Sequence, residues 1–323
     1  MNQKTLWAGG VVAALLAAYL AVPLLFGDQY WMSTLIAALV IAGIAVPWAM
    51  LAALGGLVSF GHAAFFGLGA YASALLTMKL GWSVLPAMLA GGVAATLSSI
   101  LVIPALRLKG PYFALAMLAY AEIFRIVVTE AERWTGGAGG LLGIARLPSF
   151  SLFGATFDLS SKIGSYLVVL TMVCLSVCIY AWLKSSVYGF ALAAMGESED
   201  ATKVLGVHTT LLKVVVLGLS AFLTGLIGAF NAHSINFLEP DYAFAGTWSL
   251  LPTVGALVGG FRYVTGPVLG AMFVYLCSQL LFKPLIGHGH EIVYGILLVI
   301  VVLVSPEGML SLFSRKGRVS ASH

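Results

Sequence analysis

The sequence predicts an all-α protein, a polytopic bundle of transmembrane helices. Of its 323 residues, 61% are hydrophobic and only 9% are charged, whereas soluble domains carry about 25% charged residues. Apolar runs of about 20 residues, each long enough to cross a hydrocarbon core of roughly 30 Å, recur from one end of the chain to the other. These observations exclude a soluble domain and predict a multi-pass membrane protein.

Ten spans can be drawn through the apolar runs, and together they form a single transmembrane domain over residues 1–323. The first run has the basic flank of a signal peptide, but its apolar stretch exceeds the roughly 7–15 residues of a signal core and a second span follows. We therefore interpret it as a retained span. The predicted spans are residues 6–26, 33–52, 57–78, 82–103, 111–128, 163–183, 213–232, 247–262, 264–283 and 289–305.

The distribution of basic residues predicts that both termini are cytoplasmic. An even number of spans places the termini on one side of the membrane, and cytoplasmic loops are enriched in Lys and Arg. With the amino terminus inside, ten of the 16 Lys and Arg residues face the cytoplasm, five face outward, and Arg125 lies within a span. The ten cytoplasmic residues are Lys4, Arg107, Lys109, Lys184, Lys203, Lys213, Arg262, Arg315, Lys316 and Arg318.

The third predicted span is unusually rich in glycine. Gly55 and Gly56 precede it, and Gly67 and Gly69 follow within the run. Glycine weakens a helix and allows two backbones to approach closely. A broken helix at membrane depth is tolerated only where it is buried in protein or lines a cavity. Tight helix packing and an element of a translocation path both fit the pattern.

The longest segment on the predicted outer side covers about residues 129–162 and is too long for a simple turn. It contains a glycine-rich stretch, residues 135–141. Beyond it, Phe150 and Leu152 alternate with polar residues before Gly154, and residues 156–159 follow. This pattern around a glycine predicts a small β-hairpin within the loop.

The sequence offers no set of residues for catalysis, for a metal or for a cofactor. No GxxxxGK[ST] pattern occurs in the chain, so it does not bind ATP through a P-loop. His288 and His290 flank one glycine and form only a weak candidate metal pair. Cys174, Cys178 and Cys277 fall within predicted spans, where thiols pack as small apolar groups. We therefore predict that the chain is not an enzyme.

Glu122 and Arg125 are two ionisable residues within the fifth predicted span, three positions apart. Charged groups inside a span are costly and usually face one another or a cavity. A local ion pair near the outer end of the helix and a contact with a polar substrate both fit this spacing. An ion-driven transporter would need further intramembrane acids for ion coupling, and the spans do not supply them.

The polar segment 185–207 interrupts the apolar runs in the second half of the chain. At 100° per residue, a helix over residues 190–205 gathers its charged residues on one side, and Gly206 follows it as a helix stop does. Such a helix either inserts an uncharged face into a partner's groove or connects two spans at the membrane surface. The uncharged face comprises Ala191, Ala194, Met195, Ser198, Ala201, Thr202 and Leu205.

Motifs along almost the whole chain match, in the same order, those of one known family. They are GLVSFGHAAFFGLGAY at 56–71, LKGPYFA at 108–114, TGGAGGL at 135–141, YG at 188–189, ATKVLG at 201–206, Gly259, Gly266, Pro267 and Gly270, and SPEG at 305–308. The first and the fourth are the most specific. The chain resembles the LivM-type permease subunits of ATP-binding-cassette importers for branched-chain amino acids, a group that also contains urea and short-amide permeases.

This resemblance implies the import of branched-chain or related amino acids across the bacterial inner membrane. It implies a heterodimer with a second, LivH-type permease subunit, two cytoplasmic ATPase subunits and a periplasmic binding protein. Segment 129–162 would then be periplasmic, and segment 185–207 would be the cytoplasmic coupling segment. An importer of urea, short amides or aromatic acids is the alternative, and an ion-driven secondary transporter is a more distant one.

The resemblance also points to candidate residues for two roles. Contact with the ATPase is expected at Tyr188, Gly189, Ala191, Ala194, Met195, Ser198, Ala201, Thr202, Leu205 and Gly206. A translocation path is expected along Ser59, His62, Phe65, Phe66, Tyr71, Glu122 and Arg125. The chain departs from its relatives at Phe190 and Gly196, where they usually carry arginine, so we expect docking by packing of the uncharged face.

Overall fold

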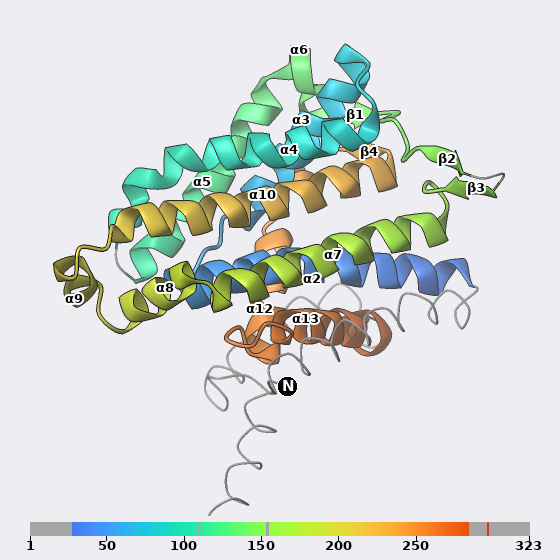
Figure 1. The fold of residues 1–323 in the computed structure, drawn as a ribbon. Helices are drawn as coiled ribbons and strands as arrows, with labels where there is room; N and C mark the ends of the chain where they lie inside the picture. The colour runs from blue at the N-terminus through green and yellow to red at the C-terminus, as the bar shows by residue number, and fades with distance from the viewer. Residues whose placement is uncertain (1–27, 109, 153–154, 284–295, 297–323) are drawn as a thin grey trace, which may run out of the picture.

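A computed structural model describes residues 28–283, apart from residues 109 and 153–154, together with residue 296. Most of this part is helical, and several of the long helices lie side by side with their axes roughly aligned (Figure 1). Predicted span 6–26 lies outside the described residues, and so does span 289–305 except for residue 296.

Within the described residues, six helices are long and apolar enough to cross a membrane, which makes the chain a multi-pass membrane protein. Two further predicted spans correspond to shorter helices, and the total of ten spans stays a prediction. The six are α2 (Gln29–Gly55), α3 (His62–Leu80), α4 (Val84–Ser98) with its 3₁₀ continuation Ser99–Arg107, α5 (Pro111–Glu130), α7 (Lys162–Ser185) and α10 (Thr209–Ile235). The shorter two are α12 (Thr247–Gly259) and α13 (Gly266–Cys277), which continues as the π-helical turn Ser278–Phe282.

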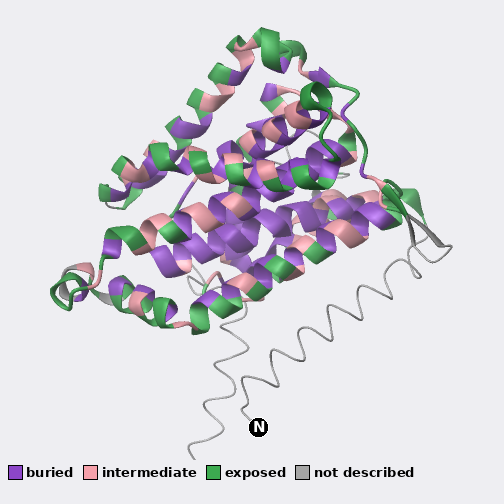
Figure 2. Ribbon diagram, turned by 45° about the horizontal axis from the view of Figure 1, so that its top comes forward, coloured by how far each residue is buried: buried purple, intermediate pink, exposed green. Residues whose placement is uncertain are grey.

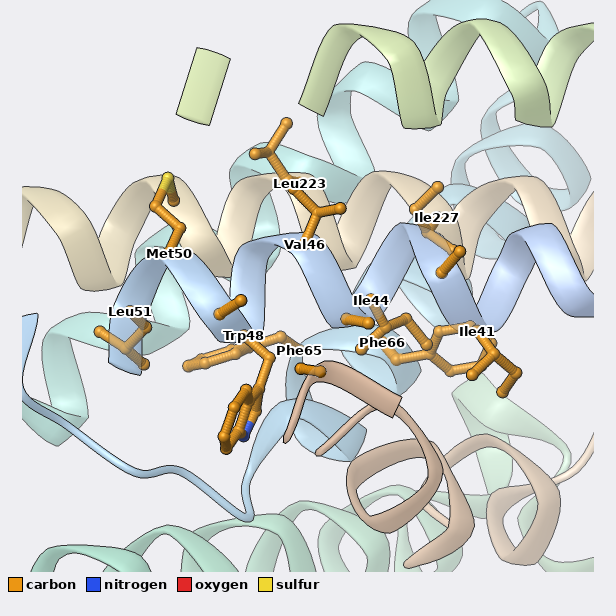
Figure 3. Close-up of a cluster of buried hydrophobic side chains, with 14 of the residues drawn as sticks. Ile41, Ile44, Val46, Trp48, Met50, Leu51, Phe65, Phe66, Leu223 and Ile227 are labelled. Atoms are coloured by element: carbon orange, nitrogen blue, oxygen red, sulfur yellow. The ribbon is translucent and has the colours of Figure 1, made fainter. Parts of the chain in front are cut away.

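Helix α2 occupies the centre of the bundle, and 89% of the residues in its most apolar stretch are buried. A helix that is apolar all round is expected to be covered on every side. Figure 2 shows the resulting buried layer, which α2 and α10 share. Side chains of α2 pack with Phe65 and Phe66 of α3 and with Leu223 and Ile227 of α10 (Figure 3). The core of the bundle therefore lies where these three helices meet.

Glycines bring α3, α4 and α10 into close contact. A Cβ atom at Gly69 would meet the backbone carbonyl oxygen of Gly225 in α10. A Cβ atom at Gly91 in α4 would lie 2.5 Å from the carbonyl oxygen of Gly69. Because the obstructing atoms belong to the backbones of packed helices, they cannot move aside as a side chain does. Close packing therefore accounts for Gly69 inside the third predicted span.

Short strands and helices form connections between the long helices. The predicted hairpin is present as β2 and β3, with Phe150 opposite Phe157, and its turn falls on the undescribed residues 153–154. In Figure 1 this hairpin and α9 lie at opposite ends of the bundle. The elements are α6 (Glu132–Thr135), the 3₁₀ turn Gly137–Gly139, β1 (Leu141–Leu142) paired antiparallel with β4 (Phe237–Leu238), β2 (Ser149–Leu152) paired antiparallel with β3 (Ala155–Asp158), and α11 (Pro240–Ala243).

Segment 185–207 forms two helices, so the prediction of one continuous helix over residues 190–205 was wrong. The first is α8 (Val187–Glu197) and the second is α9 (Glu199–Val204). Ser198 between them has an extended backbone, with φ −156° and ψ 108°. The break turns α9 away from the direction of α8.

A contact with α10 explains this break. Glu199, the first residue of α9, forms ion pairs with Lys203 in α9 and with Lys213 in α10. Thr202, which was expected on the uncharged face that contacts the ATPase, is buried as well. These tertiary contacts override the helical periodicity of the sequence. Gly206 ends the segment as predicted, with a positive φ of 84° that favours glycine.

Candidate functional site

The connection between α2 and α3 enters the bundle without forming a helix. The chain is non-helical from residue 56 to residue 61, so α3 begins at His62, whereas the sequence predicted a span from residue 57. Side chains satisfy part of this irregular backbone: Trp48 Nε1 donates to the carbonyl oxygen of Ser59 at 2.7 Å, and the Gly61 N–H donates to Ser59 Oγ at 3.2 Å. Irregular backbone needs such partners inside a membrane protein.

The first residue of α3 lies deep within the bundle. His62 Nε2 is 3.0 Å from Ser220 Oγ, and that hydroxyl donates to the carbonyl oxygen of Pro47 at 2.9 Å. Ser220 is eleven residues after the start of α10, and Pro47 is eight residues before the end of α2. At about 1.5 Å per residue, both lie roughly 12–17 Å inside their helices. The interruption of the third span is therefore near the middle of the bundle.

Helix α12 begins at the same depth as α3. Ser249, in its first turn, accepts a hydrogen bond from the N–H of Ala63 at 2.9 Å. Trp248 stacks on Phe66 with 4.3 Å between the ring centroids. Helices that begin within the membrane are a recurring feature of transporters, whose solute sites lie at such ends. Here Ser249 and Phe66 are buried, so the junction of the two helix starts is closed.

The structure divides the seven predicted path residues into two groups. Five of them are buried inside the bundle and pack against neighbouring helices, as Phe65 does against Tyr120. The other two lie on the surface of α5. The buried five are Ser59, His62, Phe65, Phe66 and Tyr71.

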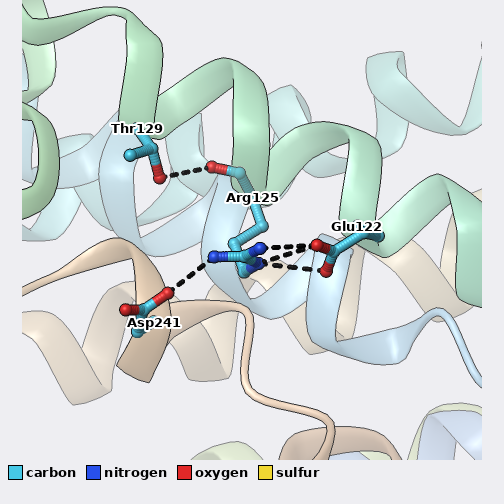
Figure 4. A network of polar contacts seen from close by, with 4 residues as sticks. All are labelled: Glu122, Arg125, Thr129 and Asp241. Carbon is cyan, nitrogen blue, oxygen red and sulfur yellow. Dashed lines mark hydrogen bonds and ion pairs between the residues drawn. The ribbon is translucent and has the colours of Figure 1, made fainter.

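The two surface residues belong to a cluster of three charged side chains (Figure 4). Arg125 Nη2 lies 2.5 Å from Glu122 Oε1, which confirms the local ion pair predicted from their spacing. Arg125 Nη1 also lies 2.8 Å from Asp241 Oδ1, and Thr129 Oγ1 donates to the carbonyl oxygen of Arg125 at 2.8 Å. The cluster of Glu122, Arg125 and Asp241, called here the charged triad, therefore joins α5 to α11.

Sequence reasoning missed Asp241. It is one of two acids, with Glu239, in the connection between two predicted spans, and no periodic pattern marks it. Its pairing with Arg125 spans 116 positions. Only the return of α11 against α5 brings the two together.

A second missed network ties α3 and α10 to the glycine-rich loop. His233 Nε2 lies 2.8 Å from Ser73 Oγ, and His233 Nδ1 lies 2.7 Å from the carbonyl oxygen of Ala145. Asn236, which ends α10 with a positive φ of 63°, donates from Nδ2 to the carbonyl oxygen of Ile144. These bonds hold the loop against both helices.

The residues predicted to contact an ATPase do not share one face. Met195 and Thr202 are buried, and Gly189 is packed so closely that a Cβ atom there would meet the carbonyl oxygen of Leu183. Ala191 is half-buried, and the side chain of Ala201 lies outside the description. The exposed members are Tyr188, Ala194, Ser198, Leu205 and Gly206.

Large apolar side chains nevertheless remain exposed on this segment. They are Val187, Tyr188 and Phe190 on α8, and Val204 and Leu205 at the end of α9. Gly196, which like Phe190 stands where an arginine was expected, has open space beside it. A cavity of about 700 Å³ lies beside the end of α9 and is lined by Lys203 and residues 206–211. The segment thus has an exposed apolar surface next to this cavity.

Ion pairs hold α9 against the start of α10. Glu199 Oε2 accepts a hydrogen bond from Lys213 Nζ at 2.7 Å, and Glu199 Oε1 lies 3.0 Å from Lys203 Nζ. Lys213 first, and Lys203 second, hold the pKa of Glu199 down at about 2, well below its ordinary value. The carboxylate therefore stays charged at neutral pH.

Among the described residues, no three His, Cys, Asp or Glu side chains come together as a metal site needs. The weak candidate pair His288 and His290 lies outside those residues. The described helices thus contain an interrupted span, a charged triad on a span surface and a polar two-helix segment at one end. These features define a polytopic membrane transport protein.

Comparison with known families makes the class specific. Residues 30–302 match the family described as the permease component of branched-chain amino acid transport systems, and the chain belongs to this family.

Relatives with curated names agree with the family. The chain is 30% identical to the high-affinity branched-chain amino acid transport system permease protein LivM of Salmonella typhimurium and 29% identical to that of Escherichia coli, each over 282 residues. These alignments cover 80% of this chain, which spans 64% of the length of either relative. The ribose import permease protein RbsC of Bacillus subtilis is 25% identical over 59% of this chain and 58% of its own length. No solved structure matches.

Proposed function

We propose that the chain is the permease subunit of an ATP-binding-cassette importer for branched-chain or related amino acids. The family match over residues 30–302 carries this proposal. The two LivM relatives support this substrate class over a sugar, because they align with more of the chain and at higher identity than the ribose permease does. Urea, short amides and aromatic acids remain the alternative substrates.

The proposed complex contains a second, LivH-type permease subunit, two cytoplasmic ATPase subunits and a periplasmic binding protein. ATP hydrolysis belongs to the ATPase subunits, since this chain has no P-loop sequence. The complex resides in the bacterial inner membrane, with ten spans and both termini of this chain in the cytoplasm. The basic residues of the loops support this orientation, which puts α9 in the cytoplasm and the β2–β3 hairpin in the periplasm.

The ATPase contacts the α8–α9 segment. Exposed Phe190 and Leu205 and the 700 Å³ cavity beside α9 support this assignment, because an apolar surface next to a hollow suits an inserted partner segment. The packed residues Gly189, Met195 and Thr202 then support the segment from beneath. The ion pairs of Glu199 transmit the movement of α9 to α10.

The solute crosses where this chain meets the second permease subunit. The burial of His62, Phe65 and Phe66 supports this location, since a continuous route inside the chain would pass through closed packing. These residues form the wall behind the route. Glu122 and Arg125 lie outside this wall, on the exposed surface of α5.

Uptake by the reconstituted complex tests the substrate. Proteoliposomes that contain both permease subunits and the ATPases, supplied with the binding protein and radiolabelled leucine, are expected to accumulate leucine. Excess valine or isoleucine is expected to compete, and excess urea is not. ATP-dependent accumulation of urea without accumulation of leucine would contradict the assignment.

A further inference from the structure

Two described spans have broad exposed faces, and these faces differ in chemistry. On α4, every residue is uncharged, and the large exposed side chains are aliphatic: Leu85, Leu89, Val93 and Leu97. On α5, aliphatic residues are exposed as well, but Glu122 lies among them with 54% of its side chain exposed. The large apolar residues exposed on α5 are Tyr112, Leu115, Leu118, Ile123, Ile126 and Val127.

Glu122 lies too deep to reach the membrane surface. It is eleven residues from the start of α5 and eight residues from its end. At about 1.5 Å per residue, these distances correspond to roughly 16 and 12 Å along a helix that is about as long as the hydrocarbon core is thick. A glutamate side chain is much shorter than either distance. Hydrocarbon is therefore not a favourable covering for this face.

The charged triad carries one uncompensated negative charge. Arg125 supplies one positive charge, and Glu122 and Asp241 supply two negative charges. The side chain of Asp241 is 81% exposed, so the pairing with Arg125 leaves much of it open. A group that covers the triad in a low-dielectric environment must bring a positive charge.

We propose that the face formed by α5 and the charged triad binds the second permease subunit, and that this subunit places a basic side chain against Glu122 and Asp241. The inference deepens the proposed function and rests on it, because it names the surface that joins the two permease subunits. Leu118 and Ile123 beside the triad are as compatible with lipid as with another helix, so the charges of the triad decide between these two, and a water-filled route calls for a polar lining. The uncharged face of α4 is then the one in contact with lipid.

Site-directed spin labelling in the assembled complex tests the two faces against each other. In a background in which Cys174, Cys178 and Cys277 are replaced by serine, single cysteines replace Leu118 on α5 or Leu89 on α4. The label at position 118 is expected to be immobilised and at least fivefold less accessible to oxygen than the matched label at position 89.

Either of two results overturns the inference. If the label at position 118 is as accessible to oxygen as that at position 89, lipid covers both faces. If the label at position 118 is accessible to a water-soluble nickel chelate, the α5 face lines a water-filled route.

A charge series tests the basic side chain. Glu122→Gln brings the triad from net charge −1 to 0, and adding Asp241→Asn brings it to +1. Copurification of the second subunit is expected to fall stepwise, at least threefold and then at least tenfold. Glu130→Gln, at the exposed end of α5, is the matched control and is expected to change nothing.

Thermal unfolding of each variant chain checks that the subunit itself remains folded. Unchanged copurification of the double variant would overturn the proposed charge pairing.

The outcome is separable from the proposed function: a complex that assembles through this face but fails to import leucine contradicts only the function. Import of leucine by a complex whose α5 face contacts lipid contradicts only this inference.

Discussion

Replacing Glu199 with glutamine removes the carboxylate that two lysines share, while it keeps the size of the side chain. Glu199 Oε2 lies 2.7 Å from Lys213 Nζ, and the Lys213 side chain is only 12% exposed. After the change, this mostly buried ammonium group loses its ion pair with Glu199. We expect α9 to separate from α10 more often, because its main polar contact with that helix is lost.

The size of this effect follows from the pKa of Glu199. Its pKa falls from 4.5 to about 2 in the folded chain, and each pKa unit corresponds to about 1.4 kcal/mol. Because the Glu199 side chain is 32% exposed and solvent screens part of the interaction, we expect only about 1–2 kcal/mol. The folded pKa is the lower one, so this stabilisation is complete above about pH 4.5 and is lost as the pH falls toward 2.

Amide hydrogen exchange at pH 7 measures the opening of α9 directly. A loss of about 1–2 kcal/mol corresponds to roughly five- to thirtyfold faster exchange in residues 199–206 of Glu199→Gln. The matched control Glu132→Gln removes an exposed carboxylate at the other end of the bundle and is expected to leave this exchange unchanged. Exchange in the Glu199 variant within twofold of the parent would refute the assignment of the ion pairs.

Three further substitutions test the packing, the interrupted span and the docking surface. Gly69→Ala is expected to destabilise the purified chain by about 1–3 kcal/mol in thermal unfolding, because a Cβ atom there meets backbone atoms of α10. Gly196→Ala is the control, since a Cβ atom at Gly196 enters open space. Equal effects of the two changes would contradict the close packing at Gly69. Ser220→Ala is expected to cost about 1–2 kcal/mol, since it leaves both ring nitrogens of His62 without a partner, and an unchanged unfolding temperature would argue against this bond. Leu205→Arg is expected to lower ATPase copurification at least tenfold without changing the unfolding temperature, and normal copurification would exclude this residue from the docking surface.

The helices were largely predictable because their cause is local. A run of about 20 apolar residues crosses a membrane only as a helix, in which every backbone group finds its partner within the run. The eight predicted spans that fall within the described residues all correspond to helices. The hairpin around Gly154 followed from equally local alternation.

The departures arise where distant residues decide the local structure. Helix α3 starts only at His62, and Trp48 supplies a partner to the irregular stretch before it, which periodicity alone would continue as a helix. The break at Ser198 follows from the pairing of Glu199 with Lys213 across two helices. Neither contact can be read from a single stretch of sequence.

The charged triad shows the same limit at the candidate site. Spacing was enough to predict the pair of Glu122 and Arg125, because residues three apart share a helical face. The third member, Asp241, depends on how α11 folds back against α5. The net charge of the site, on which the proposed contact with the second subunit rests, therefore required the structure.

Leucine uptake with and without ATP hydrolysis tests the central claim most directly. Proteoliposomes are prepared with the complete complex, with a complex whose ATPase subunits cannot hydrolyse ATP, or with this chain alone. The account predicts accumulation of leucine against its gradient only in the first preparation and only when ATP is supplied to the ATPase side. Accumulation by this chain alone, driven by an ion gradient, would contradict it.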